Sequence, residues 1–385
     1  MHPRTQVTSA RKARIAIVGA GPAGASAGWH LATRGHAVTL IDRAAFPRDK
    51  TCGDWITPAA LSELSLLGLD STSLARLAPG HATVTTTRLV APDGRESTRT
   101  SGRPGGCITR RVLDHLVRER ALAAGCLALE RTIRDIAAET ALFAEYDHIV
   151  DARGATAGVA NAIGLRGYLT VSKTAVAADA SNRVEIYTDA CCRRGYGWIF
   201  PVHADEHTVH FNIGVGLWKD DSRGGQSVND YFDRFLADNA VAREIQAAAV
   251  ETVRPVGYPV GLGLWRNRVA EGRVLRIGDA ANLADPLTGD GIGNALASGR
   301  LVAEAIAAAS DSADAAQRWQ FQFQMIFAGE LRRAFALRQL LSSTSAKNLA
   351  TWLLERGAPA LGTRLHRAIF GETPYRDAWR AGDRQ

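Results

Sequence analysis

The chain has 385 residues, of which 46% are hydrophobic and 22% are charged. This composition excludes a disordered, collagen-like or disulfide-stapled protein, and the length predicts two or three structural units. No apolar run in the sequence approaches the roughly 18 residues that are needed to cross a bilayer. Five irregularly spaced cysteines predict reduced thiols and a cytoplasmic location.

The net charge is +7, and most of it lies near the C-terminus. Residues 331–385 hold ten Lys or Arg against four Asp or Glu, which gives 10 − 4 = +6. Such a segment can contact an acidic carrier or an anionic membrane surface, although a solvated helical face is the plainer interpretation. We expect no nucleic-acid partner.

The N-terminal part of the chain has the pattern of a nucleotide-binding βαβ unit. A β-branched strand over residues 14–18 leads into a turn with Gly19, Gly21 and Gly24, and a helix is expected over 25–34. A second strand over 37–41 ends at Asp42. In this context the glycines let a pyrophosphate approach the helix N-terminus, and Asp42 can accept hydrogen bonds from ribose hydroxyls. The cofactor is either FAD or a nicotinamide.

The middle of the chain changes to strands of period two, between about residues 165 and 253. In the clearest case, apolar residues at 209, 211, 213 and 215 alternate with less apolar ones, which predicts an antiparallel sheet with one face covered. A last strand of the nucleotide-binding unit is expected over 273–277. From residue 293 onward the pattern is helical.

A second set of motifs resolves the choice of cofactor. Gly278-Asp279 follows the strand over 273–277, and the run Pro-Leu-Thr-Gly-Asp-Gly-Ile over 286–292 follows it. Here the sequence resembles FAD enzymes of the para-hydroxybenzoate hydroxylase-like superfamily, and most of all the geranylgeranyl reductase family. The resemblance implies that Asp279 binds the FAD ribityl chain and that Pro286 lies at the ring edge. Backbone N–H groups around Gly289, Gly291 and Ile292 would face the pyrimidine end of the ring.

The resemblance also implies the fold class, which is α/β. It comprises a Rossmann-type FAD-binding domain, an inserted antiparallel β-sheet substrate domain and a C-terminal helical segment. We expect the FAD-binding domain over 14–164 and 256–308. The substrate domain would occupy 165–255, and the helical segment 309–385.

Three further segments resemble the same family. In the segment over 46–53, Cys52 would sit at the flavin face, and in the Arg-x-x-Leu-Asp pattern over 110–114, Arg110 would approach the FAD. The Tyr-x-Trp-x-Phe-Pro run carries Tyr196, Trp198 and Phe200 in the substrate domain. Alternation along a strand places these aromatic residues on one face, which suits the wall of an apolar substrate site better than core.

Cys52 and Asp54 are the candidate catalytic residues. A thiol is mostly protonated at neutral pH and can donate a proton, and Asp54 would place a carboxyl group in the same pocket. The alternatives are a packing thiol and a turn cap. The remaining tryptophans considered are interpreted as core: Trp218, Trp265, Trp319 and Trp352.

No metal site is expected. His203, His207 and His210 lie close together in sequence, but their spacing around a turn and a strand matches no known ligand pattern.

These observations predict an FAD-dependent oxidoreductase acting on a hydrophobic small molecule. The reaction would be hydride transfer to or from a carbon–carbon bond of an isoprenoid, polyene or specialised metabolite. The alternatives are a flavin monooxygenase in natural-product tailoring and a non-redox cyclase that holds FAD structurally. NAD(P)H would bind only transiently as electron donor, because the segment over 151–155 lacks the Asp-Gly of a second fingerprint.

Overall fold

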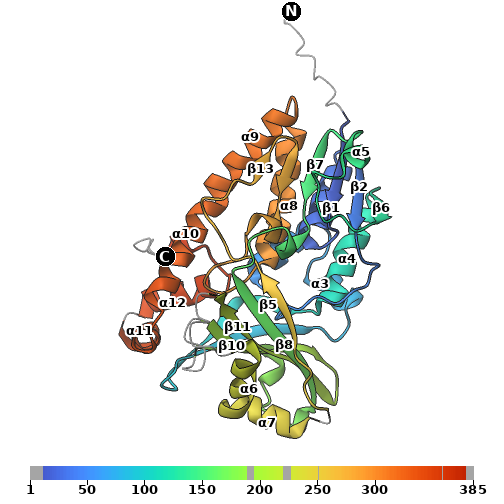
Figure 1. The fold of residues 1–385 in the computed structure, drawn as a ribbon. Helices are drawn as coiled ribbons and strands as arrows, with labels where there is room; N and C mark the ends of the chain where they lie inside the picture. The colour runs from blue at the N-terminus through green and yellow to red at the C-terminus, as the bar shows by residue number, and fades with distance from the viewer. Residues whose placement is uncertain (1–11, 189–194, 220–226, 250, 358, 379–385) are drawn as a thin grey trace, which may run out of the picture.

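The computed structural model describes residues 12–188, 195–219, 227–249, 251–357 and 359–378. These residues form a parallel nucleotide-binding sheet, a larger curled sheet beside it, and a run of C-terminal helices along one side (Figure 1). The predicted α/β class is confirmed.

The nucleotide-binding sheet has six strands in the order β13-β14-β7-β1-β2-β6. They are β1 (Arg14–Val18), β2 (Ala37–Asp42), β6 (Leu127–Glu130), β7 (His148–Asp151), β13 (Ala270–Glu271) and β14 (Val274–Arg276). All pairs are parallel except the edge pair β13–β14. The sheet is packed by α1 (Pro22–Ala32), α4 (Arg110–Ala123) and α8 (Ile292–Ala307). Because helices cover it, β1 is buried along almost its whole length.

The larger sheet has eight strands in the order β12-β8-β11-β10-β9-β4-β5-β3. They are β3 (Trp55–Ile56), β4 (Ala82–Val90), β5 (Glu96–Cys107), β8 (Ala162–Ser172), β9 (Arg183–Tyr187), β10 (Gly195–Ala204), β11 (Thr208–Trp218) and β12 (Val256–Val260). Its pairs are antiparallel except for β4–β9. The sheet therefore extends beyond the expected segment 165–255. Strands β4 and β5 gave no signal because their outward positions are filled by Thr, Ser, Arg and Gly.

Two different layers cover the two faces of this sheet. On one face lie α6 (Val228–Asp238) and α7 (Ala240–Ala248), whose Phe232, Phe235 and Ile245 pack on the strands. On the other face Trp198 and Phe200 pack together with residues of the C-terminal helices. The second face is the one that meets the nucleotide-binding unit.

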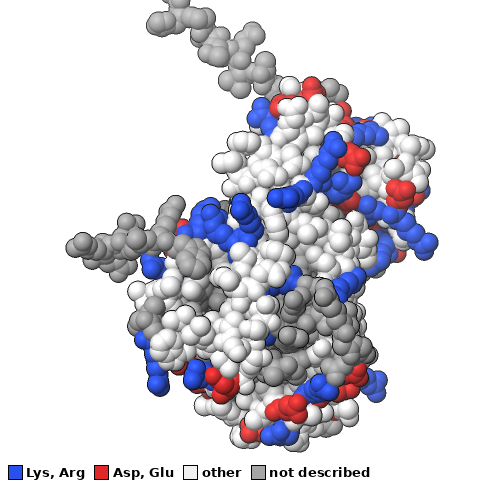
Figure 2. All heavy atoms as spheres, turned by 60° about the vertical axis from the view of Figure 1, so that its left-hand side comes forward, with Lys and Arg blue, Asp and Glu red and all other residues white. Residues whose placement is uncertain are grey.

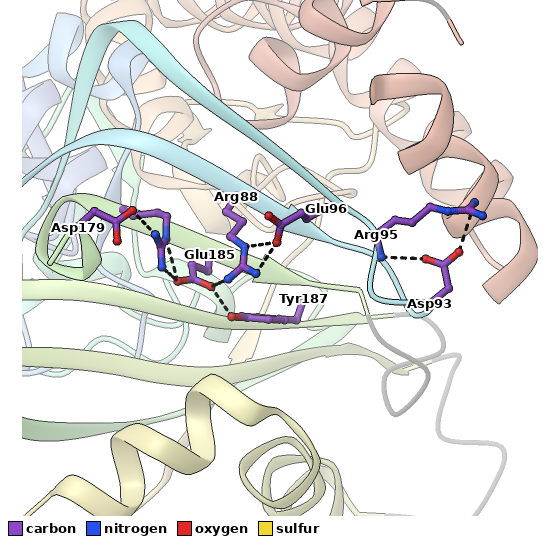
Figure 3. Close-up of polar contacts among 8 residues, drawn as sticks. Arg88, Asp93, Arg95, Glu96, Asp179, Glu185 and Tyr187 are labelled. Atoms are coloured by element: carbon purple, nitrogen blue, oxygen red, sulfur yellow. Dashed lines mark hydrogen bonds and ion pairs between the residues drawn. The ribbon is translucent and has the colours of Figure 1, made fainter. Parts of the chain in front are cut away.

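A buried carboxylate joins β4 to β9 (Figure 3). Glu185, which is 3% exposed, accepts hydrogen bonds from Arg88 at 2.8 Å, from Arg183 at 2.8 Å and from the hydroxyl of Tyr187. Because the charge is paired and hydrogen-bonded, its burial is tolerated. We interpret this cluster as a structural link between the two strands.

The C-terminal helices run along the side of both sheets (Figure 1). They are α9 (Ser312–Gln322), η6 (Phe323–Ala328), α10 (Gly329–Leu340), α11 (Thr344–Trp352), η7 (Leu353–Gly357), α12 (Pro359–Ile369) and α13 (Tyr375–Ala378). Three shorter helices lie earlier in the chain: α2 (Pro58–Leu66), α3 (Ser71–Leu77) and α5 (Thr140–Phe143). None of the helices in the described residues has the length and apolarity to traverse a bilayer.

A buried histidine fastens α12 to the larger sheet. His366 lies 2.7 Å from the hydroxyl of Thr87 on β4 and 3.2 Å from that of Ser97 on β5. Burial lowers the pKa of His366 to about 3, so the ring is neutral and pairs with hydroxyls. Of the tryptophans predicted to be core, Trp319 is fully buried, whereas Trp352 is 39% exposed and that prediction was wrong.

Candidate active site

A cavity of about 1000 Å³ lies between the nucleotide-binding sheet and the larger sheet. The turn after β1, the loop after β2, strand β10 and the loop before α8 all contribute to its lining. Of the residues predicted to form the site, the following line it: Gly19, Gly21, Asp42, Cys52, Arg110, Tyr196, Trp198, Asp279, Gly289, Gly291 and Ile292. Segments far apart in sequence thus meet in one space.

The glycine turn is shaped for a close backbone approach. A side chain on Gly19, whose φ is +104°, would place its Cβ 2.2 Å from the carbonyl oxygen of Ala152. A side chain on Gly24 would lie 1.8 Å from the carbonyl oxygen of Gly19, so Gly24 lets α1 pack on the turn. The space at Gly21 is open except for Arg48 at 3.4 Å. This cradle fits the pyrophosphate of a dinucleotide.

Two helix N-termini face the cavity. Helix α1 begins after Gly21 and α8 begins after Gly291, and neither has a side-chain cap. Pro22 has no N–H, and the N–H of Ile292 hydrogen-bonds the Asp290 carboxylate. The next N–H groups of each first turn have no partner within the helix, so they can bind anionic groups of a ligand. Asp42 lines the cavity while its carboxylate accepts hydrogen bonds from the N–H groups of Ala20 and Ala44 at 2.7 and 3.0 Å.

Charged side chains surround the middle of the cavity. Asp279 lies in the lining with Lys50, whose Nζ is 3.2 Å from Oδ2 of Asp279. Arg110 is buried and forms a two-pronged pair with Asp114, at 2.6 and 2.8 Å. Pro286 does not line the cavity, and its carbonyl oxygen accepts the indole N–H of Trp218 at 3.1 Å.

An aromatic wall closes the far end of the cavity. Tyr196, Trp198 and Trp218 form it, with the Tyr196 ring 5.9 Å from the Trp198 ring and 6.2 Å from the Trp218 ring. The Tyr196 hydroxyl donates to the carbonyl of Thr288, which ties β10 to the loop before α8. Phe200 does not line the cavity and lies under Gly53.

Trp218 is 6% exposed and packs in a buried apolar cluster, as predicted. It also lines the cavity, which the period of its strand indicates. Gly214, Gly216 and Trp218 alternate along β11 and therefore share a face. A side chain on Gly214 would place its Cβ 2.2 Å from the Trp198 ring. The two glycines make room for the wall, and Trp218 completes it.

The thiol of Cys52 is a candidate proton donor in the lining of the cavity. Cys52 is half-buried and lines the cavity. Burial raises the pKa of the Cys52 thiol, which keeps it protonated at neutral pH. A protonated thiol facing a cavity can donate a proton.

Asp54 lies behind the wall and does not line the cavity. Its carboxylate is fully buried and accepts hydrogen bonds from the Tyr168 hydroxyl at 2.5 Å, the Asn212 amide at 2.8 Å and the Arg110 backbone N–H at 3.2 Å. Burial raises the pKa of Asp54 to about 6. Its backbone has a φ of +65°, and its hydrogen bonds lead us to interpret it as a support for the loop of Cys52.

Asn212 is a residue that the sequence patterns did not single out. Its amide N–H₂ donates to the carbonyl of Cys52 at 2.6 Å and to Asp54, and its carbonyl oxygen accepts the Trp198 indole N–H at 2.8 Å. The side chain is fully buried. The amide of Asn212 therefore links the Cys52 loop and Asp54 to Trp198 of the aromatic wall.

The structure also brings together a group that the sequence spacing did not predict. His203 and His210, on paired strands, lie with Asp205 so that their ligand atoms are within 4.8 Å of one another, and His207 is not among them. The carboxylate of Asp205 already accepts backbone N–H groups of His207 and Thr208, at 2.8 and 2.7 Å. None of these residues lines the cavity.

Several known proteins are similar to this chain. Residues 12–151 match the FAD binding domain family. The chain is 30% identical over 319 residues to a geranylgeranyl diphosphate reductase from Rhodobacter capsulatus, covering 75% of this chain and 73% of that protein. It is 29% identical over 342 residues to a menaquinone reductase from Mycobacterium tuberculosis, covering 80% of this chain and 78% of that protein.

The fold agrees with these relatives. The crystal structure of a geranylgeranyl bacteriochlorophyll reductase-like protein from Thermoplasma acidophilum superimposes with a TM-score of 0.72 at 18% identity, covering 96% of this chain and 98% of that one. The glycine cradle and the two uncapped helix N-termini fit FAD, which is the cofactor of this chain. The protein belongs to the geranylgeranyl reductase family of FAD-dependent oxidoreductases.

Proposed function

We propose that the protein reduces a carbon–carbon double bond of a hydrophobic, isoprenoid-type molecule. Relatives named as reductases of geranylgeranyl diphosphate and of menaquinone support this reaction. The observation that carries the proposal is a second, apolar cavity of about 200 Å³, which shares Tyr196 and Trp218 with the first. Its apolar lining includes Leu89, Leu337, Leu341, Leu354, Leu365 and Ile369.

This arrangement suits a substrate with a hydrocarbon chain. The chain would lie in the apolar cavity, and its double bond would reach the aromatic wall at Tyr196 and Trp198. Aromatic side chains stabilise an apolar ligand through buried area, at roughly 25 cal/mol per Å². The rest of the large cavity is left to the cofactor.

Saturating one double bond requires a hydride and a proton. Bound FAD supplies the hydride in its reduced form. Cys52 holds a proton at Sγ and would transfer it to the second carbon of the bond. The N–H groups at the start of α8 would stabilise negative charge on the bound cofactor, and Asn212 and Asp54 hold the Cys52 loop in place.

NAD(P)H is proposed as the electron donor, bound only transiently. Within the described residues there is one parallel sheet with one glycine fingerprint. The segment over 151–155 lacks the Asp-Gly of a second fingerprint, and there the Asp151 carboxylate pairs with Arg153 at 2.8 Å. We therefore expect no tightly held nicotinamide beside FAD.

Anaerobic stopped-flow spectroscopy tests the reaction. The purified protein is reduced with dithionite and mixed with geranylgeranyl diphosphate or with menaquinone. We expect the flavin absorbance to return while the product gains two hydrogen atoms. A product that gains oxygen, and forms only with NADPH and O₂, would instead identify a monooxygenase. Turnover with the flavin oxidised throughout would identify a non-redox cyclase.

A further inference from the structure

Helix α11 lies between the apolar cavity and solvent, and it presents apolar side chains on both of these sides. On the inner side, Ala350 of α11 and Leu354 of η7 line the cavity, together with Lys347 and Thr351 of α11. On the outer side Leu349 is 55% exposed and Trp352 is 39% exposed. A helix at a water-facing surface normally places polar residues outward. Its outer side therefore suggests contact with something other than water.

The apolar lining of the cavity continues to this outer side. Leu353, the first residue of η7, lines the cavity and is also 41% exposed. Leu340, at the end of the preceding helix α10, is 68% exposed. The cavity and the exposed apolar side chains are thus parts of one continuous region.

The C-terminal segment that contains this region has a net positive charge. In the described part of 331–378 there are eight Lys or Arg and three Asp or Glu, so the balance is 8 − 3 = +5. Arg356, three residues after Leu353 in η7, is exposed, and so is Glu355 before it. Figure 2 brings this side of the molecule forward and shows blue Lys and Arg side chains beside white surface along the C-terminal helices.

We propose that this region docks on an anionic phospholipid bilayer. The docking surface, called here the α11 surface, consists of Leu349, Trp352, Leu353 and Arg356. Trp and Leu side chains partition into the interface between head groups and acyl chains, and basic residues are attracted by anionic lipids. Apolar contact and charge together give the two signals that stable peripheral binding needs.

Other occupants explain the α11 surface less well. A second copy of the chain would bring one cationic face against another, which like charges disfavour. An acidic carrier protein would match the charge but would leave Leu349 and Trp352 in water. A bilayer accounts for both features. It also lets a hydrocarbon substrate reach the cavity without crossing water, and this last point rests on the proposed function.

Vesicle sedimentation tests the proposal with the full-length, FAD-loaded protein. One set of vesicles is phosphatidylcholine alone, and the other is phosphatidylcholine and phosphatidylglycerol in equal parts. We expect binding to the mixed vesicles that weakens with added salt. The double variant Leu349→Ser/Trp352→Ser should bind at least about tenfold more weakly, since each side chain loses apolar burial. Arg356→Glu should weaken binding to the mixed vesicles only.

The chain offers a matched control. Leu127 and Leu129 on edge strand β6 are 69% and 38% exposed, close to the exposure of the tested pair. Leu127→Ser/Leu129→Ser should bind like the wild type. Far-UV circular dichroism and flavin absorbance check that every variant is folded and loaded with FAD.

Three results would overturn the proposal. The wild type could sediment with neither set of vesicles, or it could bind the neutral vesicles as strongly as the mixed ones. The surface double variant could also bind as strongly as the wild type. If the wild type were a dimer and the surface double variant a monomer, the occupant of this surface would be a second copy of the chain. Because sedimentation needs no turnover, failure of the proposed reduction would leave this test unaffected. Conversely, reduction of substrate in detergent would persist in the surface double variant even if docking failed.

Discussion

Asn212 is the residue whose replacement tests the candidate site most directly. Its amide contacts the carbonyl of Cys52, the carboxylate of Asp54 and the indole of Trp198, at 2.6, 2.8 and 2.8 Å. All of these contacts are buried or nearly so. Substituting Asn212→Leu keeps the side-chain volume similar and removes the three hydrogen bonds together.

The expected loss follows from the groups left without a partner. A buried polar group deprived of its hydrogen bond costs about 1–3 kcal/mol. The indole N–H and the Cys52 carbonyl lose the partner described here, whereas Asp54 keeps Tyr168 and the Arg110 backbone. We therefore expect the free energy of unfolding to fall by about 3–5 kcal/mol, near the upper end for single substitutions.

Urea unfolding of the FAD-loaded protein, followed by tryptophan and flavin fluorescence, measures this loss. Thr170→Val is a suitable control, since it removes one half-buried contact of 2.8 Å to His210 in the same sheet. That control should cost no more than about 1 kcal/mol. If Asn212→Leu cost no more than the control, Asn212 would not hold the Cys52 loop and the Trp198 wall together.

Five other substitutions follow from the geometry. Gly21→Val and Asp279→Ala should each abolish the yellow colour of the purified protein, because one fills the cradle and the other removes a lining carboxylate; undiminished flavin absorbance would contradict this. Trp198→Ala should raise the substrate KM and leave FAD content nearly unchanged, whereas Cys52→Ser should lower kcat more than it raises KM. Finally, burial raises the pKa of Asp54 to about 6, so the folded chain binds this proton more tightly than the unfolded chain. Stability of the wild type relative to Asp54→Asn should then fall by about 3 kcal/mol between about pH 4 and pH 6, and a flat difference would contradict the burial argument.

The parts of the fold that sequence could predict are those that local chemistry determines. The first strand, glycine turn and helix lie within residues 14–32, and each has its own pattern. The turn needs Gly19 because its φ is +104° and its Cβ would overlap Ala152. Tyr196 and Trp198 share a cavity-facing side because strand alternation is also local.

The parts that sequence could not predict depend on distant contacts. Asn212 and Cys52 are 160 residues apart, and nothing near Asn212 indicates which carbonyl it will bind. Strands β4 and β5 join the larger sheet although most of their outward side chains are polar, since pairing partners decide their place. Trp352 is apolar in a helical pattern, which is equally typical of core and of an exposed apolar face.

The network around Asp54 suggests why a buried carboxylate sits beside a cavity that it does not line. Burial raises the pKa of the Cys52 thiol most strongly, and the charge of the Asp54 carboxylate raises it further. The Arg110 guanidinium, the backbone N–H of Asp54 and the Lys50 ammonium group lower it. Asp54 therefore counteracts the two cations that favour a thiolate. A thiolate would be a nucleophile with no proton to give. By keeping the thiol protonated and its loop in place, Asp54 would act as a positioning residue for proton donation by Cys52.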